Sequence, residues 1–182
     1  MILTGHEIAK QVREGRIQID PFHEDSISPN SYDLSLGDTI IRYTDDVLDT
    51  RRENPCETFP LSNNGLTLMP REFYLGCSKE IVGSKHFVPI LHGRSSFARL
   101  GLFVHVTADL LDIGYHGNLT FQLFPAHAIS VYPGDKIAQV SFWVPEGPIT
   151  LYSGKYQGSI GPVASRSYID ESLPQGDHPG LS

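Results

Sequence analysis

Hydrophobic and polar residues alternate along most of the chain, which predicts short β-strands rather than helices. Turn-forming groups such as Asn63-Asn64-Gly65, His116-Gly117 and Pro133-Gly134-Asp135 separate these stretches. Because many short strands follow one another without a repeating strand–helix–strand rhythm, the pattern predicts an all-β sandwich or barrel. The expected strands are residues 31–36, 39–43, 66–69, 73–77, 87–91, 102–106, 119–124 and 137–144.

A short helix is expected over residues 4–14, ahead of the strands. Thr4 can cap its N-terminus, and Glu7 follows three residues later, as in a capping box. Gly15 is the residue type that commonly ends a helix. The pattern therefore predicts one N-terminal helix beside a β fold.

Composition changes this picture in two ways. The chain has 182 residues, a formal net charge of −7 and only 19% charged residues, against about 25% in a typical soluble domain. This length suits one domain, assigned to residues 1–170, with residues 44–65 as a polar excursion and residues 171–182 as a disordered tail. The low charge suggests that some surface is buried between subunits. The negative charge without a Lys/Arg run argues against nucleic-acid polymers as partners.

The chain also lacks the features of secreted, membrane and zinc proteins. No window approaches the roughly 18 apolar residues of a membrane span, and residues 1–15 have no apolar core like that of a signal peptide. Cys56 and Cys77 are the only cysteines, which argues against a disulfide framework. We therefore expect a cytoplasmic protein without membrane contact. The H-x-E and P-C-x-x-C motifs of zinc nucleobase deaminases are missing, so no zinc is expected.

Three polar stretches are candidates for chemistry. Residues 92–101 place two arginines around two serines, which suits a phosphate cradle but also fits a helical turn with surface arginines. Asp112 precedes a glycine-flanked turn, where it could orient a water or a sugar hydroxyl, or simply bond its own backbone. The glycine-rich residues 154–162 could close over a ligand or serve as a linker.

Taken in order, these segments resemble the dCTP deaminase family of the trimeric dUTPase-like superfamily. The resemblance rests on Pro29-Asn30-Ser31-Tyr32-Asp33-Leu34, on residues 93–102, on Leu111-Asp112-Ile113-Gly114-Tyr115, on residues 133–139 and on Lys155-Tyr156-Gln157-Gly158. It implies a mainly β, dUTPase-like distorted barrel or jelly roll with a short N-terminal helix. It also implies a homotrimer with active sites between subunits, and a pyrimidine nucleoside triphosphate bound with Mg²⁺ through its phosphates rather than through metal-ligating side chains.

The resemblance also assigns roles to residues. Arg94, Ser95, Ser96 and Arg99 are implied to face the phosphates and the reacting end of the base, with Phe97 and Ala98 in the same segment. Asp112 is implied to hold the sugar 3′-hydroxyl and, in dUTPase-type members, the attacking water, with Tyr115 under the sugar. The remaining residues expected around the substrate are Thr120, Phe121 and Gln122 along the base, and Tyr152, Lys155 and Ser159 in the closing loop.

The chain departs from the family pattern at Gln122. Family deaminases carry a glutamate there, thought to move protons between water and the cytosine ring, and an amide cannot be a general base. Gln122 is either an inactivating change in a deaminase or natural divergence, which the changed neighbour Pro125 favours; Ser159, where the closing loop of the family usually has glutamine, is a second departure. We therefore expect Mg²⁺-dependent hydrolysis of a pyrimidine nucleoside triphosphate to the monophosphate, with Asp112, Gln122, Ser95 and Arg99 at the reacting centre. The alternatives are dCTP deamination and a non-catalytic nucleotide sensor.

Overall fold

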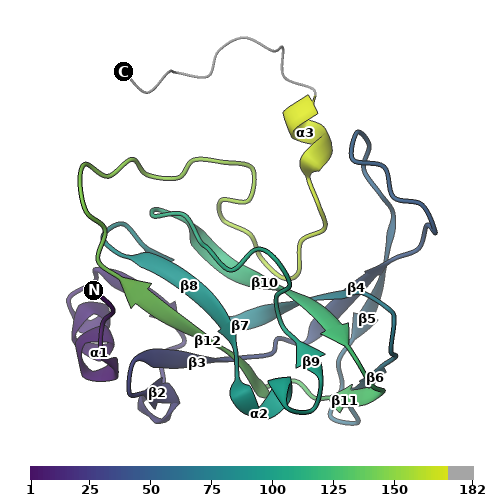
Figure 1. Cartoon of the computed structure of the whole chain (residues 1–182), viewed down its shortest axis with the longest axis horizontal. Coiled ribbons are helices and arrows are strands. Elements are labelled where there is room, and N and C mark those ends of the chain that lie inside the picture. The colour runs from purple at the N-terminus through teal and green to yellow at the C-terminus, as the bar shows by residue number, and fades with distance from the viewer. Residues whose placement is uncertain (172–182) are drawn as a thin grey trace.

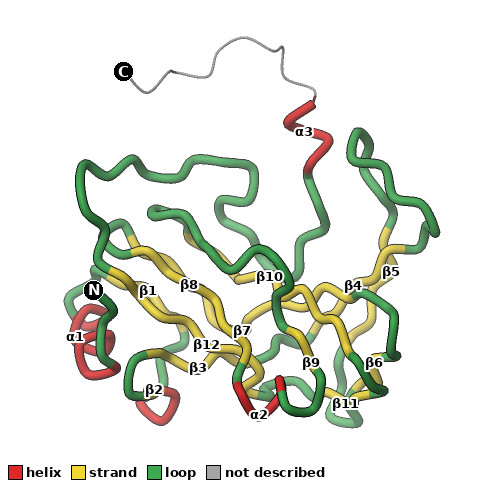
Figure 2. Tube along the Cα trace, viewed as in Figure 1, coloured by secondary structure: helices red, strands yellow, loops and turns green. Residues whose placement is uncertain are grey.

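A computed structural model describes residues 1–171, and its elements are almost all strands (Figure 1, Figure 2). The helices are α1 (Gly5–Arg13), the 3-10 helix η1 (Glu24–Ser26), α2 (Ser95–Ala98) and α3 (Ser167–Glu171). The strands are β1 (Ile17–Asp20), β2 (Ile27–Ser28), β3 (Ser31–Ser35), β4 (Thr39–Tyr43), β5 (Cys56–Pro60), β6 (Leu66–Leu68), β7 (Tyr74–Ser84), β8 (Val88–Gly93), β9 (Leu102–Phe103), β10 (His116–Pro125), β11 (Ile129–Val131) and β12 (Lys136–Trp143). The mainly β prediction is confirmed.

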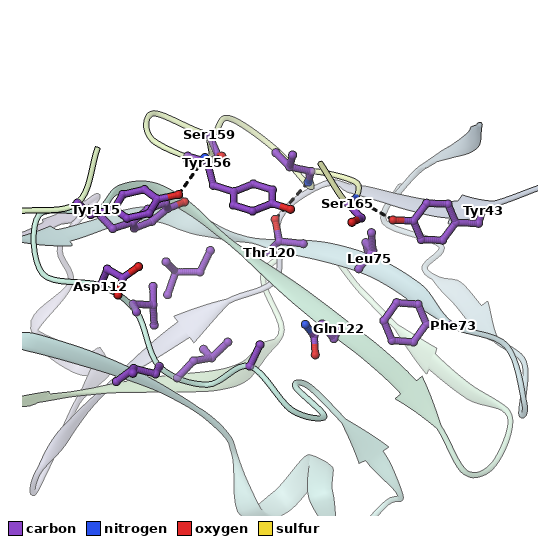
Figure 3. A pocket seen from close by; sticks show the side chains of 17 residues that line it. Tyr43, Phe73, Leu75, Asp112, Tyr115, Thr120, Gln122, Tyr156, Ser159 and Ser165 are labelled. Carbon is purple, nitrogen blue, oxygen red and sulfur yellow. Dashed lines mark hydrogen bonds between the residues drawn. The ribbon is translucent and has the colours of Figure 1, made fainter. Parts of the chain in front are cut away.

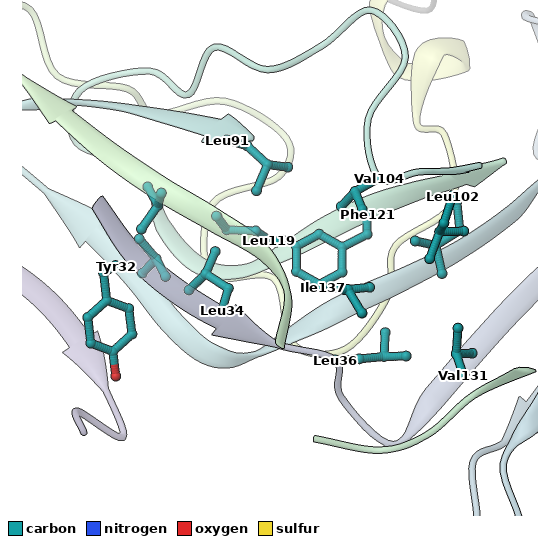
Figure 4. Packing of buried hydrophobic residues seen from close by; sticks show 14 of the residues in the cluster. Tyr32, Leu34, Leu36, Leu91, Leu102, Val104, Leu119, Phe121, Val131 and Ile137 are labelled. Atoms are coloured by element: carbon teal, nitrogen blue, oxygen red, sulfur yellow. The ribbon is translucent and has the colours of Figure 1, made fainter. Parts of the chain in front are cut away.

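The strands form three antiparallel sheets around one core. The largest has the order β5-β4-β7-β10-β9, with β1 also paired to β7, and the second has the order β2-β3-β12-β8. A two-stranded sheet joins β6 and β11. Figure 4 shows the apolar side chains that fill the space between the sheets, among them Leu34, Phe121 and Ile137, all three with no exposed surface. This packing fixes which face of each strand remains free for a ligand.

The N-terminal helix begins as the sequence predicts. The Thr4 hydroxyl accepts a hydrogen bond from the Glu7 amide at 3.4 Å, and Gly15 follows the helix with a φ of 70°. The Glu7 carboxylate does not return to Thr4 but accepts hydrogen bonds from Gln11 and Lys10. Half of the capping box is therefore present, because a neighbouring turn of the same helix competes for the acid.

Strand β7 is longer than predicted and lies at the centre of the largest sheet. It pairs with β10 along one edge, while β4 and β1 share its other edge. Ser78 and Glu80 are buried within it, so that polar residues interrupt the hydrophobic pattern by which a strand is recognised. The prediction ended the strand at residue 77 for this reason.

Other elements also differ from prediction. β1, β2, β5 and β11 were not expected, and β5 turns part of the predicted 44–65 excursion into a strand paired with β4. His116-Gly117 does not form a turn between strands but opens β10. The predicted tail lies outside the described residues except for Glu171, which ends α3. Within residues 1–171, no helix combines the length and apolar character needed to cross a membrane.

Candidate active site

A pocket of about 440 Å³ opens beside strand β10, beneath the chain segment 152–165 that follows the last strand (Figure 3). Most of its wall is aromatic or aliphatic, and a few polar groups converge on it, as in typical small-molecule sites. Its lining residues are Tyr43, Phe73, Leu75, Leu91, Ala108, Leu110, Leu111, Asp112, Tyr115, Leu119, Thr120, Gln122, Tyr152, Tyr156, Ser159, Val163 and Ser165.

Asp112 supplies the pocket's one carboxylate. It lies in a turn that is closed when the Tyr115 amide donates to the Asp112 carbonyl at 3.1 Å. Within residues 1–171 the exposed Asp112 carboxylate accepts no hydrogen bond, so it is available to a hydroxyl or a water in the pocket. Asp112 lies in a turn as expected, but among the described residues its carboxylate makes no bond to its own backbone, so the second of the two alternatives is not observed.

Tyr115 is fixed by the backbone beneath it. Its hydroxyl donates to the Asn118 carbonyl at 2.6 Å, and burial raises the pKa of Tyr115 above its usual value. Its ring packs at a tilt against Tyr152, with 6.1 Å between ring centroids. Two aromatic rings thus form a wall near Asp112, where a sugar could lie against them.

Strand β10 contributes three residues to the pocket, Leu119, Thr120 and Gln122. Leu119 and Thr120 are consecutive and lie at a register shift between Asn118 and Thr120, and regular alternation then brings Gln122 to the same face as Thr120. Phe121 points the other way and lies fully buried in the core, so its side chain does not line the site.

The amide of Gln122 is oriented by the backbone. Its Oε1 accepts a hydrogen bond from the Val106 amide at 3.2 Å, and the backbone amide of Gln122 donates to the Val104 carbonyl at 2.8 Å. Among residues 1–171, the Nε2 group donates no hydrogen bond. Gln122 therefore lies in the pocket, with its amide NH₂ group free to contact a ligand (Figure 3).

Segment 152–165 is fastened over the pocket by hydrogen bonds to the sheet. The Thr120 hydroxyl accepts from the Val163 amide at 3.1 Å, and the Tyr43 hydroxyl accepts from the Ser165 amide at 2.8 Å (Figure 3). Ser159 is 7% exposed, and its hydroxyl donates to the Tyr156 carbonyl at 2.7 Å. Segment 152–165 therefore closes one side of the pocket in the described structure, as a closing loop would and a linker would not.

The predicted phosphate cradle lies elsewhere in the single chain. Residues 94–99 include the helical turn α2, which Figure 1 shows at the lower edge of the molecule, below segment 152–165, and none of them lines the pocket. Ser95, Ser96, Ala98 and Arg99 are exposed, whereas Phe97 packs against the core.

Arg94 and Lys155 are both held by other groups. The Arg94 guanidinium lies 3.3 Å from the buried Asp33 carboxylate and donates to the Lys136 carbonyl at 3.1 Å. Burial raises the pKa of Asp33, and the charge of Arg94 opposes that rise. Lys155 pairs with Asp170 and also does not line the pocket. The structure thus places some predicted site residues in the pocket and others at residues 94–99, whereas Phe121 lies in the core and Lys155 pairs with Asp170.

Several pocket residues were missed from the sequence. Tyr43, Phe73 and Leu75 come from the end of β4 and the start of β7, far along the chain from the recognised motifs. Tyr156 was quoted within a motif but given no role, although its aromatic character in a glycine-rich loop was a usable signal. Nothing local distinguishes Tyr43, which enters the site because its strand pairs with β7.

Together, the fold and site define an all-β protein with a small-molecule pocket that holds one free carboxylate and an oriented amide. Residues 2–144 match the family described as dCTP deaminase-like. Because this match covers more than half of the chain, the protein belongs to the dCTP deaminase-like family.

Named relatives support the same assignment. The chain is 43% identical over 171 residues to the "dCTP deaminase, dUMP-forming" of Clostridium beijerinckii, a match that covers 93% of this chain and 98% of that protein. It is 41% identical to the protein of the same name from Leptospira biflexa, with the same coverage.

A solved structure shares the fold. The crystal structure of 2′-deoxycytidine 5′-triphosphate deaminase from Agrobacterium tumefaciens matches with a TM-score of 0.65 and 21% identity, over 79% of this chain and 48% of that chain. The present chain thus spans about half the length of that protein.

Proposed function

We propose that this protein is a dCTP deaminase that releases dUMP. The observation that carries the proposal is the identity of 43% over nearly the whole length of a relative named for this reaction. Conversion of dCTP to dUMP needs two hydrolytic steps. One water replaces the 4-amino group and releases ammonia, and a second cleaves the bond between the α and β phosphates and releases diphosphate. The sequence-based preference for diphosphate hydrolysis alone is thus less well supported than the deaminase alternative.

The pocket has groups suited to hold such a substrate. Asp112 offers a free carboxylate to the sugar hydroxyl or to a water, and the rings of Tyr115 and Tyr152 offer an apolar wall. Gln122 can donate to and accept from a base edge but cannot remove a proton. Deamination here would therefore use an oriented water with another proton acceptor, or proceed slowly compared with an enzyme that has a carboxylate at this position.

A second candidate function is diphosphate hydrolysis without deamination, and Gln122 is the observation that favours it. The carboxylate of Asp112 is what an attacking water at phosphorus needs, together with cationic groups on the phosphates. The binding of Mg²⁺ stays a prediction, and we expect the metal to be held by the phosphates of the substrate. Within residues 1–171 there is no group of three or more His, Cys, Asp or Glu side chains placed to hold a metal.

We further propose a homotrimer in which residues 94–99 of one subunit complete the pocket of another. The residues predicted to contact phosphates do not reach the pocket of their own chain; these are Arg94, Ser95 and Arg99. Apolar side chains also stand exposed near β9 and β10, as subunit interfaces often require. These are Leu100, Phe103, Val106 and Phe124, which are 37% to 57% exposed.

Product analysis tests the proposed function. The purified chain is incubated with dCTP, dUTP, CTP and UTP with and without Mg²⁺, and nucleotides, ammonia and diphosphate are measured. We expect dUMP, ammonia and diphosphate from dCTP. Formation of dCMP and diphosphate without ammonia would establish the second candidate instead. A thermal shift with nucleotide but no product from any substrate would contradict both and leave a nucleotide sensor.

A further inference from the structure

A second, smaller pocket of about 200 Å³ lies where the turn after β7 meets the turn before β10. Arg16, Lys85, His86 and His116 all line it, and none of its lining residues is acidic. This concentration of basic side chains stands out in a chain whose net charge is −7. A concave site lined by one sign of charge attracts ions of the opposite sign.

Buried hydrogen bonds hold the walls of this basic pocket together. The side chain of Ser84, a residue that is 6% exposed, donates to the Arg16 carbonyl at 2.8 Å and accepts from the amides of His86 and Phe87 at 3.1 and 3.0 Å. The Ser84 carbonyl accepts from the Gly114 amide at 2.7 Å. One buried serine therefore fastens the three segments that carry the basic side chains, so their positions are set before any ligand arrives.

The charges of the basic pocket are largely uncompensated by the described residues. Lys85 makes no ion pair within residues 1–171. Arg16 pairs with Glu14, but the two side chains are 45% and 40% exposed. Exposed pairs of this kind contribute little free energy, so Arg16 can exchange this partner for a ligand.

We infer that the basic pocket binds a small phosphate-type anion, namely inorganic diphosphate or phosphate. Its volume is below the roughly 300 Å³ at which pockets for drug-sized ligands begin, so it suits an inorganic anion better than a whole nucleotide. Lysine, arginine and imidazole N–H groups are the side-chain donors that recognise phosphate oxygens. The inference does not depend on whether the protein deaminates dCTP.

The basic pocket also shares a wall with the larger pocket of the candidate active site, which we call the nucleotide pocket. Tyr115 lines both of them, and a Cβ atom added to Gly83 would lie only 2.5 Å from the Tyr115 carbonyl. Gly83, near the end of β7, thus lies close against the backbone of Tyr115.

Titration of the full chain with diphosphate, and separately with phosphate, tests the inference by backbone amide NMR. We expect saturable shifts at residues 83–86 and 114–116. Lys85→Glu should weaken this binding about tenfold, which corresponds to about 1.4 kcal/mol. Arg51→Glu makes the same change of charge at an exposed site in the β4–β5 connection and should change the affinity less than twofold.

Two results would overturn the inference. Shifts confined to the nucleotide pocket, around residues 112 and 152–163, would place the anion there alone. Equal weakening by Lys85→Glu and Arg51→Glu would indicate general attraction rather than a site. Assays of dUMP formation on the same proteins keep the two proposals separate, since anion binding can persist in a protein that forms no product.

Discussion

At the scale of single residues, Gln122 is the pocket residue on which the two proposed reactions differ. Its Oε1 is held by the Val106 amide and its Nε2 is free, so the side chain is positioned as a hydrogen-bond donor to the ligand. A carboxylate in the same place could accept the Val106 hydrogen bond and also take a proton from water. The difference between the two possible reactions therefore rests on one side-chain group.

Gln122→Glu should raise the rate of ammonia release from dCTP, because it supplies a general base next to the base-binding wall. A positioned acid or base typically contributes about 10²–10⁴-fold. Ammonia and uridine nucleotide are measured under saturating dCTP. Gln122→Met, which fills the same space without a polar group, is the control and should give no increase. An unchanged rate in Gln122→Glu would mean that the rest of the pocket no longer supports deamination.

Asp112→Asn should abolish most turnover at the phosphates while the fold persists. The exposed carboxylate has no partner among residues 1–171, so its loss removes a ligand contact rather than a structural one. We expect a decrease of about 10²-fold or more in diphosphate release. Asp109 lies on the same loop but does not line the pocket, so the control variant Asp109→Asn should retain activity. Equal effects of the two variants would count against a role for Asp112.

At the scale of elements, strand β7 shows how a polar group can be buried at the centre of a sheet. Glu80 is 1% exposed, and its carboxylate accepts from the Ser35 amide on β3 at 3.0 and 3.3 Å. The contact links two sheets of the core. Burial raises the pKa of Glu80 above its usual value, and the hydrogen bond from Ser35 counters only part of that rise.

The raised pKa gives stability a pH dependence of known sign. The folded state holds the Glu80 proton more tightly than the unfolded chain, so the free energy of unfolding falls as the pH rises from about 4.5 through the raised pKa. Glu80→Gln keeps an acceptor for Ser35 but removes the titration. We expect the variant to gain stability relative to the wild type between pH 4 and pH 7.5, measured by urea unfolding. Exposed Glu146→Gln is the control, and the same relative gain there would refute the assignment.

At the scale of the whole molecule, two groups of predicted site residues do not meet within one chain, and we propose that they form one site in a homotrimer. Asp112 and Gln122 line the pocket, while Arg99 ends the helical turn α2, which lies at the lower edge of the molecule in Figure 1 and contributes nothing to the pocket of its own chain. Closed rotational symmetry can bring the two parts together, because each subunit offers one part to a neighbour and receives the other. The exposed apolar residues near β9 and β10 are where such contacts are expected.

Mixing experiments test this arrangement. Arg99→Ala and Asp112→Asn proteins should each be nearly inactive, whereas co-refolded mixtures should recover about a quarter of wild-type activity, since random assembly leaves that share of sites with both parts intact. Turnover is measured before and after mixing. Asp112→Asn and Gln122→Leu both change the pocket part of the site. A mixture of these two variants should therefore recover no activity. Failure of the first mixture to recover would show that each site belongs to one chain.

Much of the fold followed from local sequence. Alternation placed β4 at the residues observed, and the Thr4 cap with Gly15 placed α1 to within a residue at each end. β5 and β7 were missed or shortened because their side chains are exposed at an edge or polar in the core, so no two-residue period marks them. The motifs at Asp112, Tyr115 and residues 120–122 located part of the pocket, since these residues are close in sequence as well as in space.

The sequence by itself determined the class of fold, the family and the residue types available for chemistry, because these depend on periodicity, turn residues and ordered motifs along the chain. Only the tertiary structure decided which side chains share a cavity. Strand pairing brought Tyr43 and Phe73 to the pocket, alternation turned Phe121 into the core, and the sheet kept Arg94 and Arg99 away from Asp112. Such contacts join residues distant in sequence, and hydrogen bonding between strands, not local pattern, sets their register.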